Sequence, residues 1–293
     1  MVAAEFARAK VNLFLHVTGR RKDGYHTLDS LAIFPPVGDL LQMDAAPELS
    51  LHVSGPFASG LSTEQNLIVQ AARLFSRATG RVPACSFSLH KALPVSSGIG
   101  GGSADAAATL RLLARHFDEA IPADLPLNLG ADVPVCVLSE PARMAGIGEI
   151  LTEAPKLPDI GIVLVNPGLH VSTQAIFQAR RGPFSLPARL SSAWFTAESM
   201  AKDLSRLSND LEAPAVVLAP IIADVLTALR MNQNCLLARM SGSGATCFGL
   251  FRSANEATEA AKSLAYPGWW VWGGSGTTPV TDPCCDHDTG QER

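Results

Sequence analysis

The sequence contains no pair of cysteines at C-x-x-C spacing, and no cluster of histidines accompanies its 6 cysteines. Structural zinc sites depend on such spacing, so a zinc-binding module is excluded as the basis of function. Buried, reduced thiols are the simpler interpretation, and they are consistent with the cytoplasm. The residues concerned are Cys85, Cys136, Cys235, Cys247, Cys284 and Cys285.

The sequence shows neither a strong net charge nor the patterns expected of a signal peptide or a membrane span. The formal net charge is -4 at pH 7, which gives no electrostatic reason to expect nucleic acid as the main partner. The N-terminus carries charged residues early and lacks an apolar signal core. The most apolar later stretch, 213–229, is interrupted by Pro214, Pro220 and Asp224, so it predicts a core helix. We therefore expect a cytoplasmic protein whose partners are small molecules, acting as a monomer or homodimer.

The composition fits a well-packed protein of one large or two medium-sized domains. The chain has 293 residues, of which 47% are hydrophobic and 17% are charged. Two prolines in the segment 153–159, between apolar stretches, indicate a domain boundary. We expect an N-terminal domain over 1–155 and a C-terminal domain over 156–272. Residues 273–293, rich in Gly, Thr, Pro and Asp, are predicted to be a disordered tail.

One short segment, residues 93–107, is rich in glycine and serine. Before it, residues 85–90 alternate between apolar and polar, as in a half-buried strand. After it, 104–117 holds no glycine or proline and predicts a helix, with Ser103 as its N-cap and Asp105 in its first turn. Glycines let a ligand approach the main-chain amides, and a helix N-terminus attracts anions. This order of strand, loop and helix predicts a polyphosphate site.

Three familiar nucleotide-binding templates do not fit this loop. A Walker A loop needs a lysine after the glycines, and none follows here. The dinucleotide fingerprint G-x-G-x-x-G fails because Ser103 stands in place of the third glycine. A protein kinase would need H-R-D and D-F-G segments, and the chain has neither.

Polar residues in two further segments are candidates for the chemistry. Residues 11–17 alternate in polarity and predict a strand that places Lys10 and Asn12 side by side on one face. A strand lysine is usually solvated, but beside a phosphate pocket it can stabilise the charge of a transferring phosphoryl group. Asp132, between Gly-Ala and Val-Pro, is either a turn or cap residue or a carboxylate that accepts the proton of an alcohol.

Three more segments complete the pattern. Residues 19–28 predict a hairpin whose mouth carries Tyr25 and His26, an aromatic pair able to stack on a planar base. Residues 239–248 predict a second loop of small residues, which favours a phosphate-lined cleft shared by the two loops. Residues 209–212 are read mainly as a helix start.

The glycine loop matches P-x-x-x-G-[LI]-G-G-G-S-[SA], the pattern of the GHMP kinases (galactose, homoserine, mevalonate and phosphomevalonate kinases), and the chain resembles that family. The resemblance extends from about residue 7 to residue 272 and rests on the order of seven motifs, each weak alone. They are A-K-V-N-L-F-L-H-V, D-G-Y-H, the loop at 94–105, L-G-A-D-V-P, G-I-G-E, N-D-L-E and M-S-G-S-G-A-T. The D-G-Y-H and L-G-A-D-V-P pair resembles the branch that phosphorylates a cytidine-diphosphate-linked polyol.

The resemblance implies an α+β fold of two domains with the active site in the cleft between them. It implies ATP with Mg²⁺ as the cofactor and phosphorylation of a 2-hydroxyl on the polyol. The family's catalytic lysine and aspartate match Lys10 and Asp132, and its acceptor site matches Asn12, Tyr25 and His26. The ATP-binding residues would be Pro94, Val95, Ser96, Ser97, Gly98, Ile99, Gly100, Gly101, Gly102, Ser103 and Ala104.

Some points stay open at this level. Many members of the family carry a serine where this chain has Ala104, which would remove one contact to phosphate or Mg²⁺. No carboxylate ligand of Mg²⁺ is assigned, and Ser103 with the phosphates is the best candidate. Asn66 matches a position close to the nucleotide, or it caps a helix. A GHMP kinase acting on another alcohol, or a regulatory nucleotide-binding protein without catalysis, are the alternatives.

Overall fold

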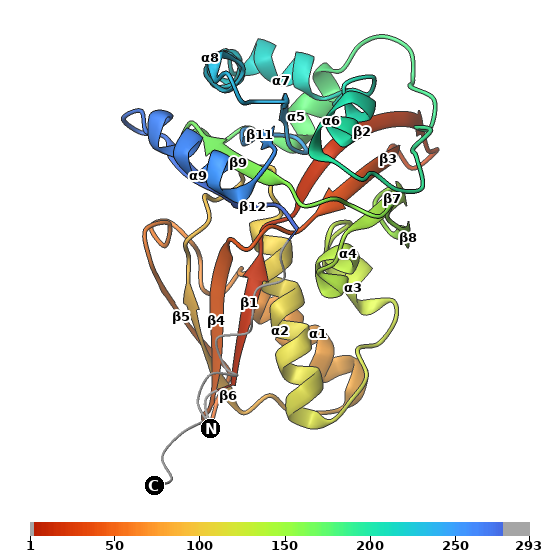
Figure 1. The fold of residues 1–293 in the computed structure, drawn as a ribbon. Helices are drawn as coiled ribbons and strands as arrows, with labels where there is room; N and C mark the ends of the chain where they lie inside the picture. The colour runs from red at the N-terminus through yellow and green to blue at the C-terminus, as the bar shows by residue number, and fades with distance from the viewer. Residues whose placement is uncertain (1–2, 278–293) are drawn as a thin grey trace, which may run out of the picture.

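The computed structural model describes residues 3–277, which form three four-stranded sheets and the helices that cover them. Figure 1 shows two of the sheets and the helices that cover them in the upper half, and the remaining sheet with its own covering helices in the lower half. The mixture of helices and antiparallel strands confirms the predicted α+β class. No helix in residues 3–277 combines the length and the apolarity that crossing a bilayer requires.

The lower sheet carries the glycine loop. Its strand order is β1-β4-β6-β5, and all pairs are antiparallel except β5 with β6. Its elements are β1 (Ala3–Arg8), β4 (Gly38–Ala45), β5 (Ser50–Ser54), β6 (Cys85–His90), α1 (Leu67–Thr79) and α2 (Gly101–Phe117). The predicted alternation of β6 is confirmed, because its apolar residues are buried and its polar ones are more exposed.

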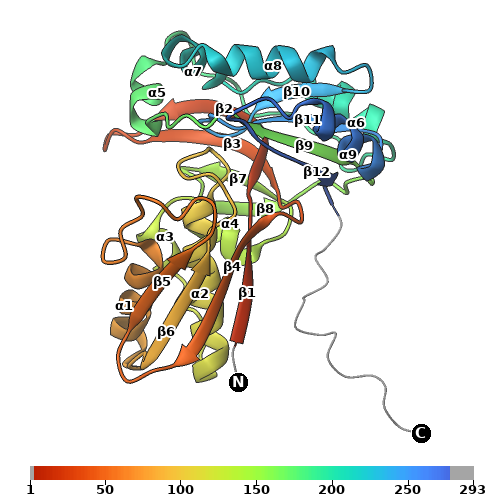
Figure 2. The ribbon, with the colours of Figure 1, turned by 90° about the vertical axis from the view of Figure 1, so that its left-hand side faces the viewer.

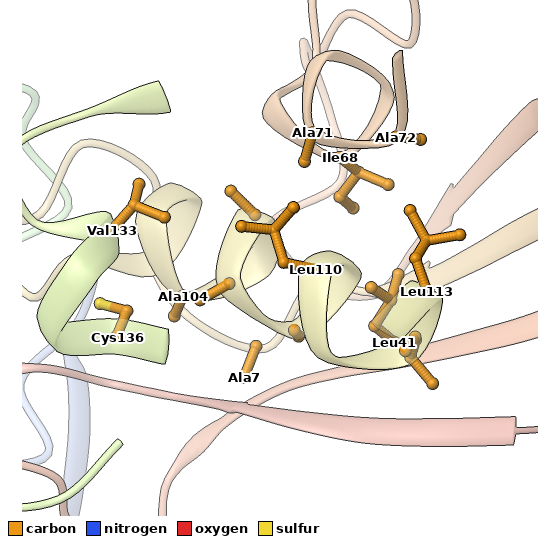
Figure 3. Packing of buried hydrophobic residues seen from close by; sticks show 14 of the residues in the cluster. Ala7, Leu41, Ile68, Ala71, Ala72, Ala104, Leu110, Leu113, Val133 and Cys136 are labelled. Carbon is orange, nitrogen blue, oxygen red and sulfur yellow. The ribbon is translucent and has the colours of Figure 1, made fainter. Parts of the chain in front are cut away.

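Helices α1 and α2 pack against each other and on one face of this sheet (Figures 1 and 2). The apolar stripe of α1 includes Ile68, Ala71 and Ala72, which face Leu110 of α2 in the core (Figure 3). Asn66 caps α1, because its Oδ1 accepts a hydrogen bond of 3.0 Å from the amide of Ile68. The fixed position of α2 determines where the preceding glycine loop lies.

A second sheet, in the order β2-β3-β7-β8, connects the two halves of the molecule. Its strands are β2 (Val11–Arg20), β3 (His26–Ile33), β7 (Ala142–Gly146) and β8 (Ile150–Glu153), and the short helices α3 (Leu125–Leu129) and α4 (Val133–Leu138) precede β7. The strand expected at 11–17 is present, but Lys10 lies just before it and a bulge follows Asn12. Residues 11–17 are all buried, because β2 has packed neighbours on both faces.

The third sheet has the order β10-β11-β9-β12 and is wholly antiparallel. Its strands are β9 (Gly161–Asn166), β10 (Leu237–Met240), β11 (Cys247–Phe251) and β12 (Trp270–Ser275). Its helices are α5 (Thr173–Ala179), α6 (Ala197–Leu204), α7 (Glu212–Leu218), α8 (Ile221–Met231) and α9 (Ala254–Ser263). The single helix expected over 213–229 is wrong: α7 ends at Leu218 and α8 starts after Pro220, which lacks an amide hydrogen.

The division of the chain at residue 155 remains a proposal. Residues 154–160 do join β8 to β9, but two of the hydrophobic clusters contain residues from both sides of this segment. Leu15 and Val17 of β2, for example, pack in the same cluster as Val163 and Val165 of β9. The parts of the chain before and after residue 155 therefore share the same packed interior.

The predicted tail needs one correction. Gly273, Gly274 and Ser275 belong to β12 and pair with β9, so ordered structure extends past residue 272. Their pairing with β9 outweighs a composition that resembles a loop. Residues 278–293 of the predicted tail, with Cys284 and Cys285, lie outside the described residues.

Candidate active site

A cleft of about 1750 Å³ lies where the glycine loop, the β2–β3 hairpin and the second small-residue loop converge. Other segments of its wall are the start of α4 and the residues around α5. Every site residue expected from the sequence lines this cleft except Ile99 and Ala104, which are buried behind it. The residues in the lining are Lys10, Asn12, Tyr25, His26, Pro94, Val95, Ser96, Ser97, Gly98, Gly100, Gly101, Gly102, Ser103 and Asp132.

The glycine loop ends in the N-terminus of α2, which starts earlier than expected. Its N-cap is Gly100 with φ = 67°, and not Ser103, which lies inside the first turn. A left-handed cap excludes the side-chain capping that a serine provides, and glycine adopts it without strain. The amide of Ala104 bonds to the carbonyl of Gly100 at 2.8 Å, so the amides of residues 101–103 have no partner within the helix. These amides stand at the cleft wall, where an anion can accept from them.

Ala104, the departure from the family pattern, faces the interior. Its side chain is 2% exposed and belongs to the core cluster that includes Val133 and Cys136 (Figure 3). A hydroxyl at this position would therefore lie among apolar side chains in this arrangement.

The two small-residue loops both line the cleft, and hydrogen bonds join them directly. The amide of Thr246 donates to the carbonyl of Ser97 at 3.0 Å, and the Ser241 hydroxyl donates to the carbonyl of Gly98 at 3.0 Å. A Cβ atom on Gly98 would lie 2.6 Å from the nitrogen of Gly244, and the φ of Gly98 is 74°. Only glycine fits both the space and the dihedral angle, so the contact of the loops depends on it.

Lys10 and Asp132 form an ion pair in the cleft. Lys10 Nζ lies 2.7 Å from Asp132 Oδ2, and the side chains are 4% and 38% exposed. The amide of Lys10 bonds to the carbonyl of Ile99 at 2.9 Å, which fixes the lysine against the glycine loop. Asp132 occupies the N-cap position of α4 but makes no side-chain capping bond, so the capping interpretation does not account for its carboxylate. The pair brings a cation and a half-exposed carboxylate to the same wall.

Asn12 lies close to this pair and carries an unused acceptor. Its Nδ2 donates to the Ser30 hydroxyl at 2.7 Å, and its backbone amide donates to the Ser241 hydroxyl at 3.1 Å. Its Oδ1 is buried and has no hydrogen-bond partner. Buried polar atoms are nearly always paired, so a free carbonyl oxygen in a cleft lining is a candidate ligand contact.

A buried charge cluster behind the loop was not expected from the sequence. Lys91 Nζ lies 2.6 Å from Asp39 Oδ2 and 2.5 Å from Asp105 Oδ2. Asp39 also accepts hydrogen bonds from the amides of Ala92 and Leu93, at 2.7 and 2.8 Å. The cluster thus joins the residues just before the glycine loop to the second turn of α2 just after it. The sequence around Asp105 indicates only a helix start. Asp39 lies on another strand, β4, and its neighbouring residues give no indication of a charge cluster.

The environment of this cluster shifts the pKa values of Asp105 and Lys91. Burial raises the pKa of Asp105 to about 7, with Lys91 opposing and Asp39 reinforcing the change. Burial acts to lower the pKa of Lys91, but the two carboxylates outweigh it and raise the value above the ordinary one. One ammonium therefore serves two carboxylates in a space with little water.

The expected β2–β3 hairpin is confirmed and places Tyr25 and His26 at the cleft. The amide of Arg21 bonds to the carbonyl of Tyr25 at 2.7 Å, and Tyr25 is 61% exposed. The His26 ring stacks on Phe177, with centroids 5.0 Å apart, and meets Phe184 edge-on at 6.5 Å. Burial, Arg20 and Arg180 each lower the pKa of His26, in that order. Phe177, Phe184 and Arg180 carried no motif that would have identified them.

The N-D-L-E motif does more than start a helix. Asn209 Oδ1 accepts from the amide of Leu211, but its Nδ2 donates to the carbonyls of Met240 and Gly242, both at 2.8 Å. The side chain therefore holds the second small-residue loop in place. Within residues 3–277, no three acidic, cysteine or histidine side chains are grouped so that they could hold a metal ion.

Comparisons with known proteins identify the family. The family model described as "GHMP kinases N terminal domain" matches residues 66–140, and "GHMP kinases C terminal" matches 196–268. A protein of Paracoccus denitrificans named 4-diphosphocytidyl-2-C-methyl-D-erythritol kinase is 52% identical over 281 residues, covering 94% of this chain and 97% of the relative. A protein of the same name from Paramagnetospirillum magneticum is 48% identical over 271 residues, covering 90% and 95%.

Solved structures give the same result for the fold. A crystal structure of 4-(cytidine 5'-diphospho)-2C-methyl-D-erythritol kinase superposes with a TM-score of 0.78 at 33% identity, covering 93% of this chain and 98% of that one. A homoserine kinase from Cytophaga hutchinsonii has a TM-score of 0.63 at 14% identity, covering 94% and 96%. The second likeness concerns the fold alone.

Proposed function

The chain belongs to the GHMP kinase family, and from that premise we propose that it phosphorylates 4-diphosphocytidyl-2-C-methyl-D-erythritol on its 2-hydroxyl. ATP is the donor, and the products are the 2-phosphate and ADP, in non-mevalonate isoprenoid precursor biosynthesis. Curated relatives of that name at about half identity over nearly the whole chain support the substrate. The observation that carries the chemistry is the Lys10–Asp132 pair, 2.7 Å apart, in the same cleft as the glycine loop.

ATP would bind with its triphosphate along the glycine loop. The unpartnered amides of residues 101–103 and the positive end of α2 favour a polyanion. Ser96 and Ser97 line the same wall, and the Ser97 hydroxyl is buried without a partner. Ile99 and Ala104 would act from behind the wall, by holding the loop in shape.

The proposed transfer is direct and in line, without a covalent enzyme intermediate. Asp132 orients the 2-hydroxyl and accepts its proton as the oxygen attacks the γ-phosphorus. The bond from the γ-phosphorus to the oxygen that bridges it to the β-phosphorus breaks, and ADP leaves with that oxygen. Lys10 stabilises the negative charge that develops on the transferring group. The free Oδ1 of Asn12 is placed to accept a hydrogen bond from a hydroxyl of the acceptor.

Magnesium fits this cleft as an ion held largely by the nucleotide. Mg²⁺ commonly takes one or two protein ligands and completes its shell with phosphates and water. The carboxylates at the cleft are engaged with cations: Asp132 with Lys10, Asp105 with Lys91 and Asp23 with Arg21. The Ser103 hydroxyl is then the side chain best placed to hold the ion. When bound, the ion would neutralise phosphate charge during transfer.

The acceptor's cytidine end is assigned to the hairpin side of the cleft. Tyr25 offers an exposed aromatic ring, and His26 lies beside it among aromatic and arginine side chains. An aromatic surface stacks on a planar base whatever its substituents, so hydrogen bonds must supply the preference for cytosine. A cytoplasmic location is proposed with this function, in agreement with the free thiols among the described cysteines.

A substrate panel tests the proposal. The purified chain is given ATP, Mg²⁺ and one alcohol at a time, and ADP release is measured. We expect ADP release with 4-diphosphocytidyl-2-C-methyl-D-erythritol and only background with mevalonate, homoserine or galactose. Release with one of the other alcohols alone would identify a different GHMP kinase. Tight ATP binding with no turnover on any alcohol would indicate a regulatory nucleotide-binding protein.

A further inference from the structure

The guanidinium of Arg180 organises the turn that follows α5. It donates to the carbonyls of Gly182 and Pro183, at 3.3 and 2.5 Å, and lies 5.3 Å from the centroid of the Phe184 ring. The side chain is 8% exposed, and its Nε has no hydrogen-bond partner. Burying a cation with an unsatisfied donor costs free energy. Other interactions must therefore stabilise the Arg180 side chain in this position.

Asp210 supplies the compensating charge and connects Arg180 to β2. Asp210 Oδ2 lies 3.8 Å from Arg180 Nη2 and accepts from the amide of Val17 at 2.8 Å. The other carboxylate oxygen accepts from the Ser208 hydroxyl at 2.8 Å, and the amide of Asp210 bonds to the carbonyl of Leu15 at 2.8 Å. The carboxylate is therefore fixed relative to β2, and it fixes the arginine in turn.

These contacts form a closed path around the hairpin side of the cleft. The path runs from β2 through Asp210 and Arg180 to Phe184, whose ring meets His26 of β3. His26 pairs with Arg20, so the path returns to β2. The rings of His26, Phe177 and Phe184 together form an aromatic wall, and His26 directly follows Tyr25 in the chain. Movement of the 180–184 turn would therefore change the position of this wall.

We propose that Arg180 and Asp210 are positioning residues for the base of the acceptor: they hold Phe184 against His26, so that the aromatic wall is formed before the nucleoside diphosphate arrives. This inference rests on the proposed function. If the aromatic wall is already ordered, binding does not have to spend free energy on ordering its side chains. The affinity for the ligand is higher for that reason. Arg180 is also one of the two cations that lower the pKa of His26, so it favours a neutral imidazole at the wall.

The test is the kinetics of Arg180→Met and Phe184→Ala with both substrates varied. We expect the KM for the cytidyl acceptor to rise about tenfold in each, while kcat and the KM for ATP stay within about twofold of the parent. The double variant should be no worse than about twice the more affected single variant, because both changes remove the same wall. Arg180→Lys should not rescue, since an ammonium lacks the planar fork of donors that lets the guanidinium bond both carbonyls beside the Phe184 ring.

Glu212→Gln is the matched control. Glu212 belongs to the same N-D-L-E motif, but it accepts from the amide of Met240 at 2.9 Å and lines a separate cavity of about 510 Å³. Its acceptor KM should equal that of the parent. A purely structural effect of the Arg180 change would lower the amount of folded enzyme, and hence the apparent kcat, without raising the acceptor KM.

The outcomes separate the two proposals. If the parent enzyme turns over the cytidyl acceptor and Arg180→Met keeps its acceptor KM, the positioning proposal is wrong and the proposed function stands. If the parent does not turn over that acceptor, the proposed function fails first. Should Arg180→Met not fold, Asp210→Asn decides in its place, because the amide removes the charge opposite Arg180 and keeps an oxygen that can accept from the amide of Val17.

Discussion

Lys10 Nζ and Asp132 Oδ2 lie 2.7 Å apart at the wall of the cleft, and their environments differ sharply. The lysine is almost completely buried, whereas more than a third of the aspartate side chain is exposed. The cation is thus fixed by its surroundings, and the carboxylate retains one side that an incoming hydroxyl can reach. This asymmetry suits a base that must meet a substrate and a cation that must stay in place.

Asp132→Asn should lower kcat by about 10²–10⁴-fold, because an amide cannot accept the proton of the 2-hydroxyl. The KM for ATP should change little, since the glycine loop keeps its contacts. ADP release at saturating substrates measures the effect. Asp124→Asn is the control, because Asp124 is an exposed residue that precedes α3 and does not line the cleft. Turnover near the parent rate in a folded Asp132→Asn protein would remove Asp132 from the mechanism.

Gly98→Ala should reduce kcat/KM for ATP by about a hundredfold, because its methyl group would push the two small-residue loops apart. Gly60→Ala is a matched control: Gly60 also has a positive φ, of 79°, but a Cβ there would meet no atom within 4 Å. Both variants should lose about 1–2 kcal/mol of stability from backbone strain, and only Gly98→Ala should lose activity. Equal activity in the two variants would show that the loop contact does not matter for ATP.

Lys91→Met should lower the free energy of unfolding by about 3–5 kcal/mol, because two buried carboxylates lose the cation that they share. Asp105→Asn should stay within about 1 kcal/mol of the parent, since one ammonium and one carboxylate remain and a buried charge is removed. Urea denaturation of the three proteins measures the difference. Similar losses in both variants would mean that hydrogen-bond geometry, and not charge balance, holds the cluster.

His26 should titrate below 6.5, its ordinary value, because burial and then Arg20 and Arg180 disfavour its protonated form. The folded chain resists this proton more than the unfolded chain does, so the contribution of His26 to stability falls as the pH drops below that value. Histidine NMR signals followed against pH give the pKa, with His26→Gln assigning the resonance. Arg180→Met should raise the pKa, and Arg252→Ala, an exposed residue outside the cleft, should leave it unchanged.

Most of the cleft could be predicted from the sequence because its components are local. The glycine loop, the hairpin with Tyr25, and the segment around Asp132 each carry their signal within a few residues. Even so, local reasoning placed the start of α2 at Ser103, because a serine is the usual cap. The chain uses the left-handed Gly100 instead, and only the packing of the loop against Lys10 reveals why: a Cβ on Gly100 would lie 3.2 Å from the lysine's Cβ.

The residues that escaped prediction depend on partners far away in the chain. Asp39 and Lys91 are 52 positions apart, and neither neighbourhood shows that the other residue exists. Arg180 is likewise one of two adjacent arginines after α5, and its contact with Asp210 arises only when the N-D-L-E segment lies along β2. Periodicity describes faces of elements and does not state which faces meet.

The hydrogen bonds of β2 determine how late in its synthesis the protein becomes able to bind nucleotide. The amide of Asn12 is satisfied by Ser241, 229 positions later, and the amide of Leu15 by the carbonyl of Ser208. A nascent chain that has exposed only its first half carries the glycine loop but has nothing to close it. Nucleotide binding is therefore expected to appear abruptly, once residues up to about Phe251 have left the ribosome.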